Sequence, residues 1–141
     1  MTENSIEVRI RDSFERQTMM ATFSASLDHV SEGRVVISAP VLLECRQQHG
    51  AAHAALTFGL GDSAAGYAAL TLGPAGTEVM TAEMKINLLA PGLGDSRLRA
   101  TGKVIKPGRR LIVVAAEIHA IDGETETLIA IMQGTMVPVA P

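Results

Sequence analysis

The feature that most constrains the fold is an unbroken run of small and apolar residues, HAALTFGLGDSAAGYAAL, at positions 53–70. The run has the length of a helix, but it lacks the polar stripe of a helix that lies on a protein surface. It carries one charge, Asp62, and three glycines where a helix favours alanine, at Gly59, Gly61 and Gly66. A helix that is apolar on all sides must be covered on most of them, so we predict a buried central helix.

The three glycines predict close approach by another element, because glycine inside a helix costs about 1 kcal/mol relative to alanine. Two interpretations remain open for them. In the first, the helix packs tightly on a sheet and this packing requires Gly59 and Gly61. In the second, the small residues leave room for another molecule to reach Asp62. A membrane span is disfavoured, because residues 51–72 contain Asp62 and His53 and no cluster of basic residues flanks them.

The segment before the central helix predicts a surface helix followed by a hairpin. Ile6, Ile10 and Phe14 recur every four residues, which is typical of an amphipathic helix and places one at about residues 5–20. The sequence SEGRVVISAP combines a turn at Glu32-Gly33 with a β-branched run that a proline ends. This combination predicts a β-hairpin around that turn.

The second half of the chain predicts four strands in succession, arranged as an antiparallel meander. In the first, VMTAEMKINLLAPG, the apolar residues at even positions 80–88 face one way and the polar residues at odd positions 81–87 face the other. Three more β-rich segments follow, with turns at Pro107-Gly108 and Asp122-Gly123. We therefore predict an α+β fold in which a curved antiparallel sheet wraps one long helix, as a single domain over residues 1–141.

Composition and charge narrow the classes of function. The formal net charge of −3 disfavours a general nucleic-acid binder, which usually has a basic excess. The single cysteine, Cys45, cannot form an internal disulfide, and we interpret it as a packed thiol. The N-terminal sequence shows no apolar signal peptide, so we expect a cytoplasmic protein. The histidines and this cysteine lack the spacing of a metal site, and no phosphate-binding glycine loop or dinucleotide fingerprint is present.

Three segments of the chain resemble a known family. RQQHGAAHAALTFGLGDSAAGYAA, TAEMKINLLAP and GKVIKPGRRLIVVAAEI look like the hotdog-fold acyl-coenzyme A thioesterases of the PaaI (phenylacetate-pathway) type, and the resemblance covers about residues 35–137. The family pattern is Asn or Gln, a Gly three positions on, His-Gly-Gly after three more, and an acidic residue nine positions beyond that His. This chain reproduces the spacing at Gln47, Gly50, His53 and Asp62, with Ala54 and Ala55 in place of the two glycines.

The resemblance implies a thioester hydrolase without a metal or redox cofactor, in which coenzyme A enters as part of the substrate. Asp62 would act as general base on water or as nucleophile on the acyl carbon. A backbone N–H at the helix start, His53-Ala54, would bind the thioester oxygen as negative charge develops. Gln47 would hydrogen-bond the thioester or the water, and Thr81 would bring a hydroxyl near the carboxylate.

Each of these residues also has a purely structural interpretation. Asp62 would then be a buried charge held by hydroxyls, His53 a helix cap, Gln47 a loop amide and Thr81 a plain strand residue. The turn IKPGRR supplies three cations that the resemblance places near the coenzyme A phosphates: Lys106, Arg109 and Arg110. A solvated hairpin turn would look the same.

Helix geometry bears on the assembly. Nine residues at about 100° each put His53 and Asp62 on opposite sides of one helix, so one chain cannot easily aim both at the same carbonyl. We therefore expect a homodimer with sites at the interface, each taking His53 from one subunit and Asp62 from the other, as in the family. A homotetramer built as a dimer of dimers fits as well.

The acyl group and one alternative function stay open. Few aromatic residues, 3%, favour a medium-chain aliphatic acyl group, while aryl-acyl groups are also carried by relatives. The alternative is a non-catalytic module that binds acyl-coenzyme A or regulates through it, because fold does not fix function. A hotdog hydratase would need a histidine soon after Asp62, and the sequence there, SAAGYAAL, has none.

Overall fold

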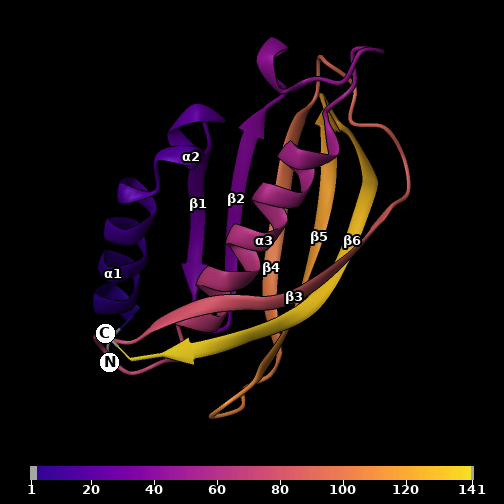
Figure 1. Ribbon diagram of the computed structural model, residues 1–141. Helices are drawn as coiled ribbons and strands as arrows, with labels where there is room; N and C mark the ends of the chain where they lie inside the picture. Colours follow the sequence, from indigo (N-terminus) through magenta and orange to yellow (C-terminus); the bar gives the residue numbers. More distant parts are fainter. Residues whose placement is uncertain (1–2, 141) are drawn as a thin grey trace.

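The computed structural model describes residues 3–140 (Figure 1). The helices are α1 (Glu3–Arg16), α2 (Thr18–Thr22) and α3 (Ala54–Leu70), with one 3-10 turn, η1 (Leu43–Cys45). The strands are β1 (Ser26–Ser31), β2 (Arg34–Pro40), β3 (Glu78–Leu88), β4 (Arg97–Lys106), β5 (Ile112–Asp122) and β6 (Thr125–Val139). They pair antiparallel in one sheet with the order β1-β2-β4-β5-β6-β3.

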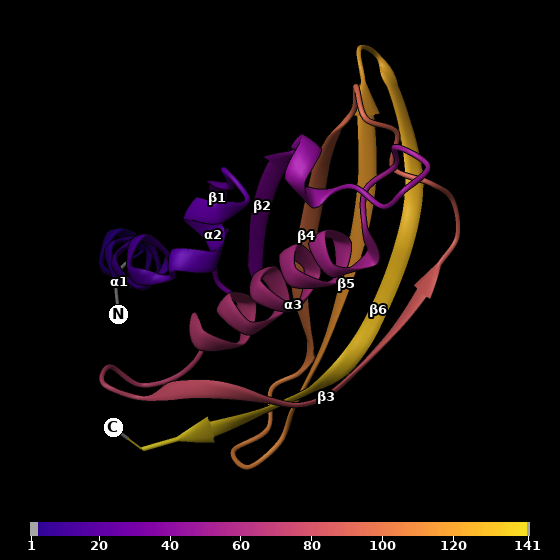
Figure 2. The ribbon, with the colours of Figure 1, turned by 45° about the horizontal axis from the view of Figure 1, so that its top comes forward.

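Helix α3 lies in the hollow of the curved sheet, as predicted (Figure 2). It packs on β2, β4 and β5, and its residues Leu60, Ala64 and Ala68 are fully buried. At Gly102 of β4 the backbones of helix and sheet come close, because an added Cβ atom there would overlap the backbone of α3 at Ala64. The core therefore forms between the helix and the concave face of the sheet.

The three glycines of α3 have different surroundings. At Gly61 an added Cβ would overlap the sulfur of Met132 and lie 3.0 Å from Cδ1 of Ile118, so tight packing on the sheet explains this glycine. At Gly59 the Cβ would lie 2.9 Å from Cε2 of Phe23, outside the sheet. At Gly66 the nearest atom is the methyl carbon of Met136 at 3.7 Å, an ordinary contact. Packing therefore requires Gly61 but not Gly66.

The N-terminal prediction is confirmed with one refinement. Ile6, Ile10 and Phe14 are buried on one face of α1, but the helix breaks at Gln17 and resumes as the short α2. The hairpin between β1 and β2 is also confirmed, with Gly33 at a φ of +73°, a left-handed conformation that favours glycine.

The prediction of a four-strand meander is wrong for β3. Strands β4, β5 and β6 follow one another, but β3 pairs with β6 and lies at the edge of the sheet. Strand β4 instead takes the place beside β2, under the helix. There its small residues Ala100 and Gly102 permit close packing on α3, which the longer side chains of β3 would prevent.

The predicted alternation along β3 also fails at one point. A bulge between Thr81 and Glu83 shifts the register against β6. Because a bulge reverses which side chains face the core, Thr81 contacts buried Met136, on the same side as half-buried Met84. Beyond the bulge, Glu83 bonds Thr135. The bulge thus turns Thr81 toward the helix.

Candidate active site

The start of α3 presents one free backbone donor. His53 is the N-cap, with φ −65° and ψ 144°, and its Nδ1 accepts a hydrogen bond from the N–H of Ala55 at 2.9 Å. Nδ1 therefore carries no proton, and the neutral ring carries its hydrogen on Nε2. The N–H of exposed Ala54 has no acceptor within the part of the chain that the structure describes. The helix dipole adds partial positive charge here, so this N–H suits a developing oxyanion.

The loop before α3 is held by its own hydrogen bonds. The side-chain oxygen of Gln47 accepts from the backbone N–H groups of His49 and Ala51. The oxygen of Gln47 therefore holds the loop, whereas residues 3–140 supply no acceptor for its NH₂ group. The backbone N–H of His53 donates to the carbonyl of Cys45 at 2.9 Å, which fixes the approach to the helix. Cys45 itself is half-buried against the core.

A hollow of about 300 Å³ lies beside this helix start. Its wall includes Gln47, Ala54 and Thr57 together with the residues that follow β3. The backbone N–H of Ala52 donates to the carbonyl of Gly92 at 2.7 Å, so the two loops that border the hollow are joined. Three of the predicted site residues, Gln47, His53 and Ala54, thus gather at this end of the helix.

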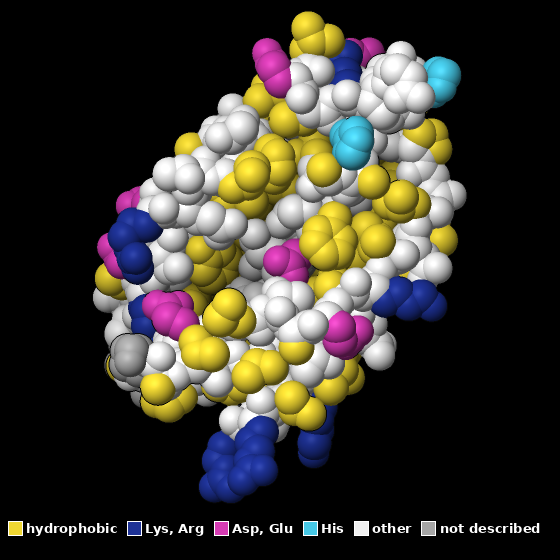
Figure 3. Space-filling model, viewed as in Figure 1, with side chains coloured by type: hydrophobic (Ala, Val, Ile, Leu, Met, Phe, Trp, Pro, Cys, Tyr) yellow, Lys and Arg dark blue, Asp and Glu magenta, His cyan; other side chains and the backbone are white. Residues whose placement is uncertain are grey.

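Asp62 lies in a second hollow, of about 200 Å³. The hydroxyl of Thr81 donates to its Oδ1 at 2.7 Å, the contact that the β3 bulge makes possible. For Oδ2, residues 3–140 supply no hydrogen-bond partner, so this oxygen is available to a water or a substrate. Figure 3 shows this face of the molecule, with an acidic side chain in a hollow bordered by hydrophobic side chains.

One chain does not bring the two groups together. The nine positions from His53 to Asp62 correspond to a rise of about 13.5 Å along α3. Asp62 lines the hollow beside the middle of the helix, whereas Ala54, the residue after His53, lines the hollow at the helix start. A reaction that uses both therefore needs a second chain or a large rearrangement of this one.

The predicted phosphate-binding cations are distant from the helix start. Lys106, Arg109 and Arg110 are exposed around the turn between β4 and β5. Figure 1 shows this turn at the end of the molecule opposite the loop that leads into α3. None of the three forms an ion pair with another described residue. Within one chain the structure does not bring them to His53.

Four polar residues beside Asp62 were not indicated by the sequence pattern. Ser63 donates to the Oε1 atom of Gln17 at 3.1 Å, and Gln17 donates to the hydroxyl of Tyr67 at 2.9 Å. Ser13 lies 3.2 Å from that hydroxyl. Ser63 and Tyr67 are about one helical turn apart and both follow Asp62, a spacing visible in the sequence, whereas the break that turns Gln17 toward them is not.

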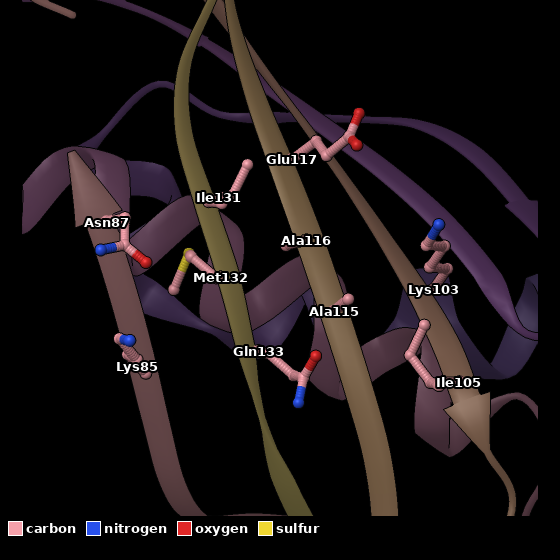
Figure 4. A pocket seen from close by; sticks show the side chains of 10 residues that line it. All are labelled: Lys85, Asn87, Lys103, Ile105, Ala115, Ala116, Glu117, Ile131, Met132 and Gln133. Carbon is pink, nitrogen blue, oxygen red and sulfur yellow. The ribbon is translucent and has the colours of Figure 1, made fainter. Parts of the chain in front are cut away.

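A larger hollow, of about 480 Å³, lies elsewhere (Figure 4). It is a shallow groove on the sheet face opposite α3, bordered by side chains such as Lys85, Lys103 and Glu117. None of the predicted site residues lines it, so its size does not make it the candidate site.

A marked electrostatic interaction also lies outside the site. Arg99 and Glu126 form two hydrogen bonds of 2.9 Å, which lower the pKa of Glu126 below its ordinary value and raise that of Arg99.

Within residues 3–140, no three His, Cys, Asp or Glu side chains gather closely enough to hold a metal ion. None of the helices in that range is long and apolar enough to cross a membrane.

Comparison with known proteins identifies the family of the chain. The sequence profile of the thioesterase superfamily matches residues 49–127, which include the helix start, Asp62 and Thr81. The chain belongs to the thioesterase superfamily. It is therefore a thioester hydrolase with the hotdog fold, and the enzyme class and fold implied by the resemblance are confirmed.

Solved structures of other thioesterases share the whole fold. A thioesterase family protein from Silicibacter pomeroyi is 37% identical over 96% of this chain and 99% of its own, with a TM-score of 0.91. A thioesterase enzyme from Staphylococcus aureus is 28% identical over 89% of this chain and 100% of its own, with a TM-score of 0.79. The PaaI protein of the phenylacetic acid degradation operon of E. coli shares the fold at 20% identity over 99% of this chain and 97% of its own, with a TM-score of 0.89. No curated protein matches the chain.

Proposed function

We propose that this thioester hydrolase acts on acyl-coenzyme A, with Asp62 as its catalytic carboxylate. The observation that carries the proposal is the setting of Asp62: a half-buried carboxylate in a small hollow, with one oxygen held by Thr81 and the other without a partner among residues 3–140. A purely structural carboxylate would have both oxygens satisfied, because an unpaired buried charge is costly.

The chemistry follows from these two oxygens. With Oδ1 fixed by Thr81, Oδ2 can take a proton from a water whose oxygen attacks the thioester carbonyl carbon. The carbonyl oxygen then becomes an oxyanion that the N–H of Ala54 stabilises. When the intermediate collapses, the carbon–sulfur bond breaks and coenzyme A leaves as a thiolate that recovers the proton. Direct attack by Oδ2 on the carbonyl carbon, through a mixed anhydride that water then hydrolyses, uses the same two groups.

The decisive experiment measures release of free coenzyme A from acyl-coenzyme A substrates of aliphatic and aryl type. Asp62→Asn is expected to reduce kcat by about a hundredfold or more, which is typical for the loss of a general base. Both proteins should carry Cys45→Ser, so that a thiol reagent reports only coenzyme A. If Asp62→Asn binds acyl-coenzyme A and retains the wild-type rate, the carboxylate is structural. If neither protein turns over an acyl-coenzyme A that it binds, the alternative of a binding module applies.

We also propose that the working unit is a homodimer with shared sites. Its support is that Ala54 and Asp62 line separate hollows in one chain, and that α3 keeps a half-exposed face at Phe58, Gly59 and Asp62. In addition, β3 is an edge strand with exposed Met80 (64%) and Leu88 (56%), and such an edge favours pairing with another chain. A twofold axis that runs the two α3 helices antiparallel would bring Ala54 of one subunit toward Asp62 of the other.

Mixed dimers test this arrangement. Asp62→Asn and Ala54→Pro each disable both sites of their own homodimer, but a mixed dimer keeps one site with both groups intact. Random exchange in an equal mixture yields half mixed dimers, so about a quarter of the wild-type activity should return. Two copies of the same variant, mixed and exchanged in the same way, are the control. No recovery, with exchange demonstrated by mass spectrometry, would contradict the shared site.

We propose that the exposed turn with Lys106, Arg109 and Arg110 binds the phosphates of coenzyme A. In such a dimer, one subunit would supply this turn and the other subunit would supply the reacting Ala54. Changing all three residues to Glu should raise KM for acyl-coenzyme A at least tenfold with little change in kcat, because these groups would bind the substrate far from the reacting atoms. A short thioester without the nucleotide, acyl-N-acetylcysteamine, is the control: its KM should not change. We likewise propose that two such dimers associate to form a homotetramer.

A further inference from the structure

The hollow that holds Asp62 ends in a wall of side chains that hydrogen-bond one another. Gln17, at the break between α1 and α2, accepts from Ser63 and donates to Tyr67, and Ser13 of α1 lies within hydrogen-bond distance of the same Tyr67 hydroxyl. All four residues line the hollow together with Asp62 and Thr81. The N-terminal helix pair therefore closes the space next to the proposed catalytic carboxylate.

This wall has more donors than its own hydrogen bonds use. The amide nitrogen of Gln17 carries two hydrogens and each of the three hydroxyls carries one, which makes five. The three hydrogen bonds use one hydrogen each, so two are left. Between residues 3 and 140 no other acceptor takes them. Donors left over in a half-buried wall can bind a ligand that brings an acceptor, and each such hydrogen bond favours that ligand.

The charges around the hollow exclude an anionic acceptor. Asp62 and Glu78 both line it, so a carboxylate on the ligand would meet two like charges. The nearby cation, Arg9, is directed elsewhere: it donates to the backbone carbonyls of Leu70, Gly73 and Pro74 at the end of α3. The acceptor that fits is uncharged.

The volume of the hollow matches a short ligand. Its volume of about 200 Å³ holds roughly six or seven non-hydrogen atoms at about 30 Å³ each. Tyr67 lies five residues after Asp62, a rise of about 7.5 Å along the helix, which an unbranched acyl chain of about five or six atoms spans. A ligand whose carbonyl lies at Asp62 would therefore reach Tyr67 and Gln17 with its far end.

We propose that this enzyme selects short acyl groups, of about five to seven non-hydrogen atoms, that end in an uncharged hydrogen-bond acceptor bound by the wall of Gln17, Tyr67 and Ser13. The proposal rests on the proposed function, because it assumes that the acyl group occupies the hollow beside Asp62. It narrows the acyl group to a length and a polarity that the sequence did not indicate.

A pair of substrates of equal size tests the wall. Hexanoyl-coenzyme A and 4-methoxybutanoyl-coenzyme A have chains of the same length and differ in one methylene that an ether oxygen replaces. The wild-type kcat/KM should be about tenfold higher for the ether, the ratio that one net hydrogen bond provides. Glutaryl-coenzyme A, with a terminal carboxylate, and decanoyl-coenzyme A, which is too long, should each be at least tenfold poorer than hexanoyl-coenzyme A.

Substitutions in the wall test which residues cause the preference for the ether substrate. Gln17→Leu should reduce the ether-to-hexanoyl ratio to about one, and Tyr67→Phe, which removes only the hydroxyl and keeps the ring beside Phe14, should reduce it in part. Gln133→Leu, the same substitution as at Gln17 but on the exposed opposite face of the sheet, is the control and should keep the wild-type ratio. A merely structural role of Gln17 would lower both rates together and would not change their ratio.

The outcomes separate this proposal from the one it rests on. A wild-type ratio of one or less, or a ratio that neither Gln17→Leu nor Tyr67→Phe changes, overturns the polar wall. The proposed function would still stand if hydrolysis of hexanoyl-coenzyme A depends on Asp62. If no acyl-coenzyme A is hydrolysed in an Asp62-dependent way, the proposed function fails first.

Discussion

The replacement Ala54→Pro isolates the contribution of one backbone hydrogen to catalysis. Proline has no N–H, and position 54 is the first residue of α3, where the N–H has no partner inside the helix. Proline is favoured at this position because its fixed φ suits the first helical turn. It also restricts the preceding residue to extended conformations, and His53 already has ψ of 144°. The fold should therefore tolerate the change.

The expected loss of activity follows from what the N–H would do in the reaction. Its neighbour, the N–H of Ala55, is engaged by Nδ1 of His53, so Ala54 is the donor available at the helix start. Removing one donor to a developing oxyanion typically costs about 2.7–4 kcal/mol, a factor of about 10²–10³ in kcat. The melting temperature should change by no more than about 3 °C, because no hydrogen bond of the folded chain is lost.

The assay is release of coenzyme A at saturating acyl-coenzyme A, with thermal unfolding of the same samples. Ala54→Ser is the matched control: it changes the side chain, keeps the N–H, and should retain most of the activity. A folded Ala54→Pro enzyme with more than a third of the wild-type kcat would refute the assignment of this N–H to the oxyanion. The carbonyl would then be bound elsewhere, and Gln47, with its free NH₂ group, would be the next residue to change.

Three other predictions concern stability at a fixed protomer concentration. Gly102→Ala should destabilise the fold by about 3 kcal/mol and lower the melting temperature by about 10 °C. The reason is that the new Cβ would overlap backbone atoms of α3 that cannot move independently. An unchanged melting temperature would contradict this contact. Gly66→Ala should instead raise the melting temperature by about 3 °C through helix propensity, since the nearest atom lies 3.7 Å away, and a decrease would show an unseen clash. The Arg99 ion pair lowers the pKa of Glu126 from its ordinary 4.5, so its contribution is present above about pH 4.5 and is lost as the pH falls further. Glu126→Gln should thus melt slightly below wild type at pH 7, and this difference should shrink as the pH falls below 4.5, whereas a difference that does not depend on pH would have another cause.

Much of the fold could be read from local patterns. The run at residues 53–70 lacks the polar stripe of a surface helix, so the burial of most of it follows from the hydrophobic effect. Ile6, Ile10 and Phe14 mark the buried side of α1, and a turn with Gly33 marks the first hairpin. The spacing from Gln47 to Asp62, through the resemblance that it carries, indicated the superfamily before any contact was known.

Tertiary structure decided what the local patterns could not. Sheet order depends on which strand fits beneath the helix, and Gly102 gives that place to β4, so β3 lies at the edge. The direction of Thr81 depends on a bulge in the pairing of β3 with β6, which an alternating sequence does not reveal. The candidate site brings together residues far apart in the chain, such as Gln17 and Tyr67, because the break after α1 turns one toward the other. Sequence by itself therefore determined the buried helix and the position of its one charge, since both are local properties. Only packing decided which side chains surround that charge, because contacts between distant segments depend on the closed shape of the whole chain.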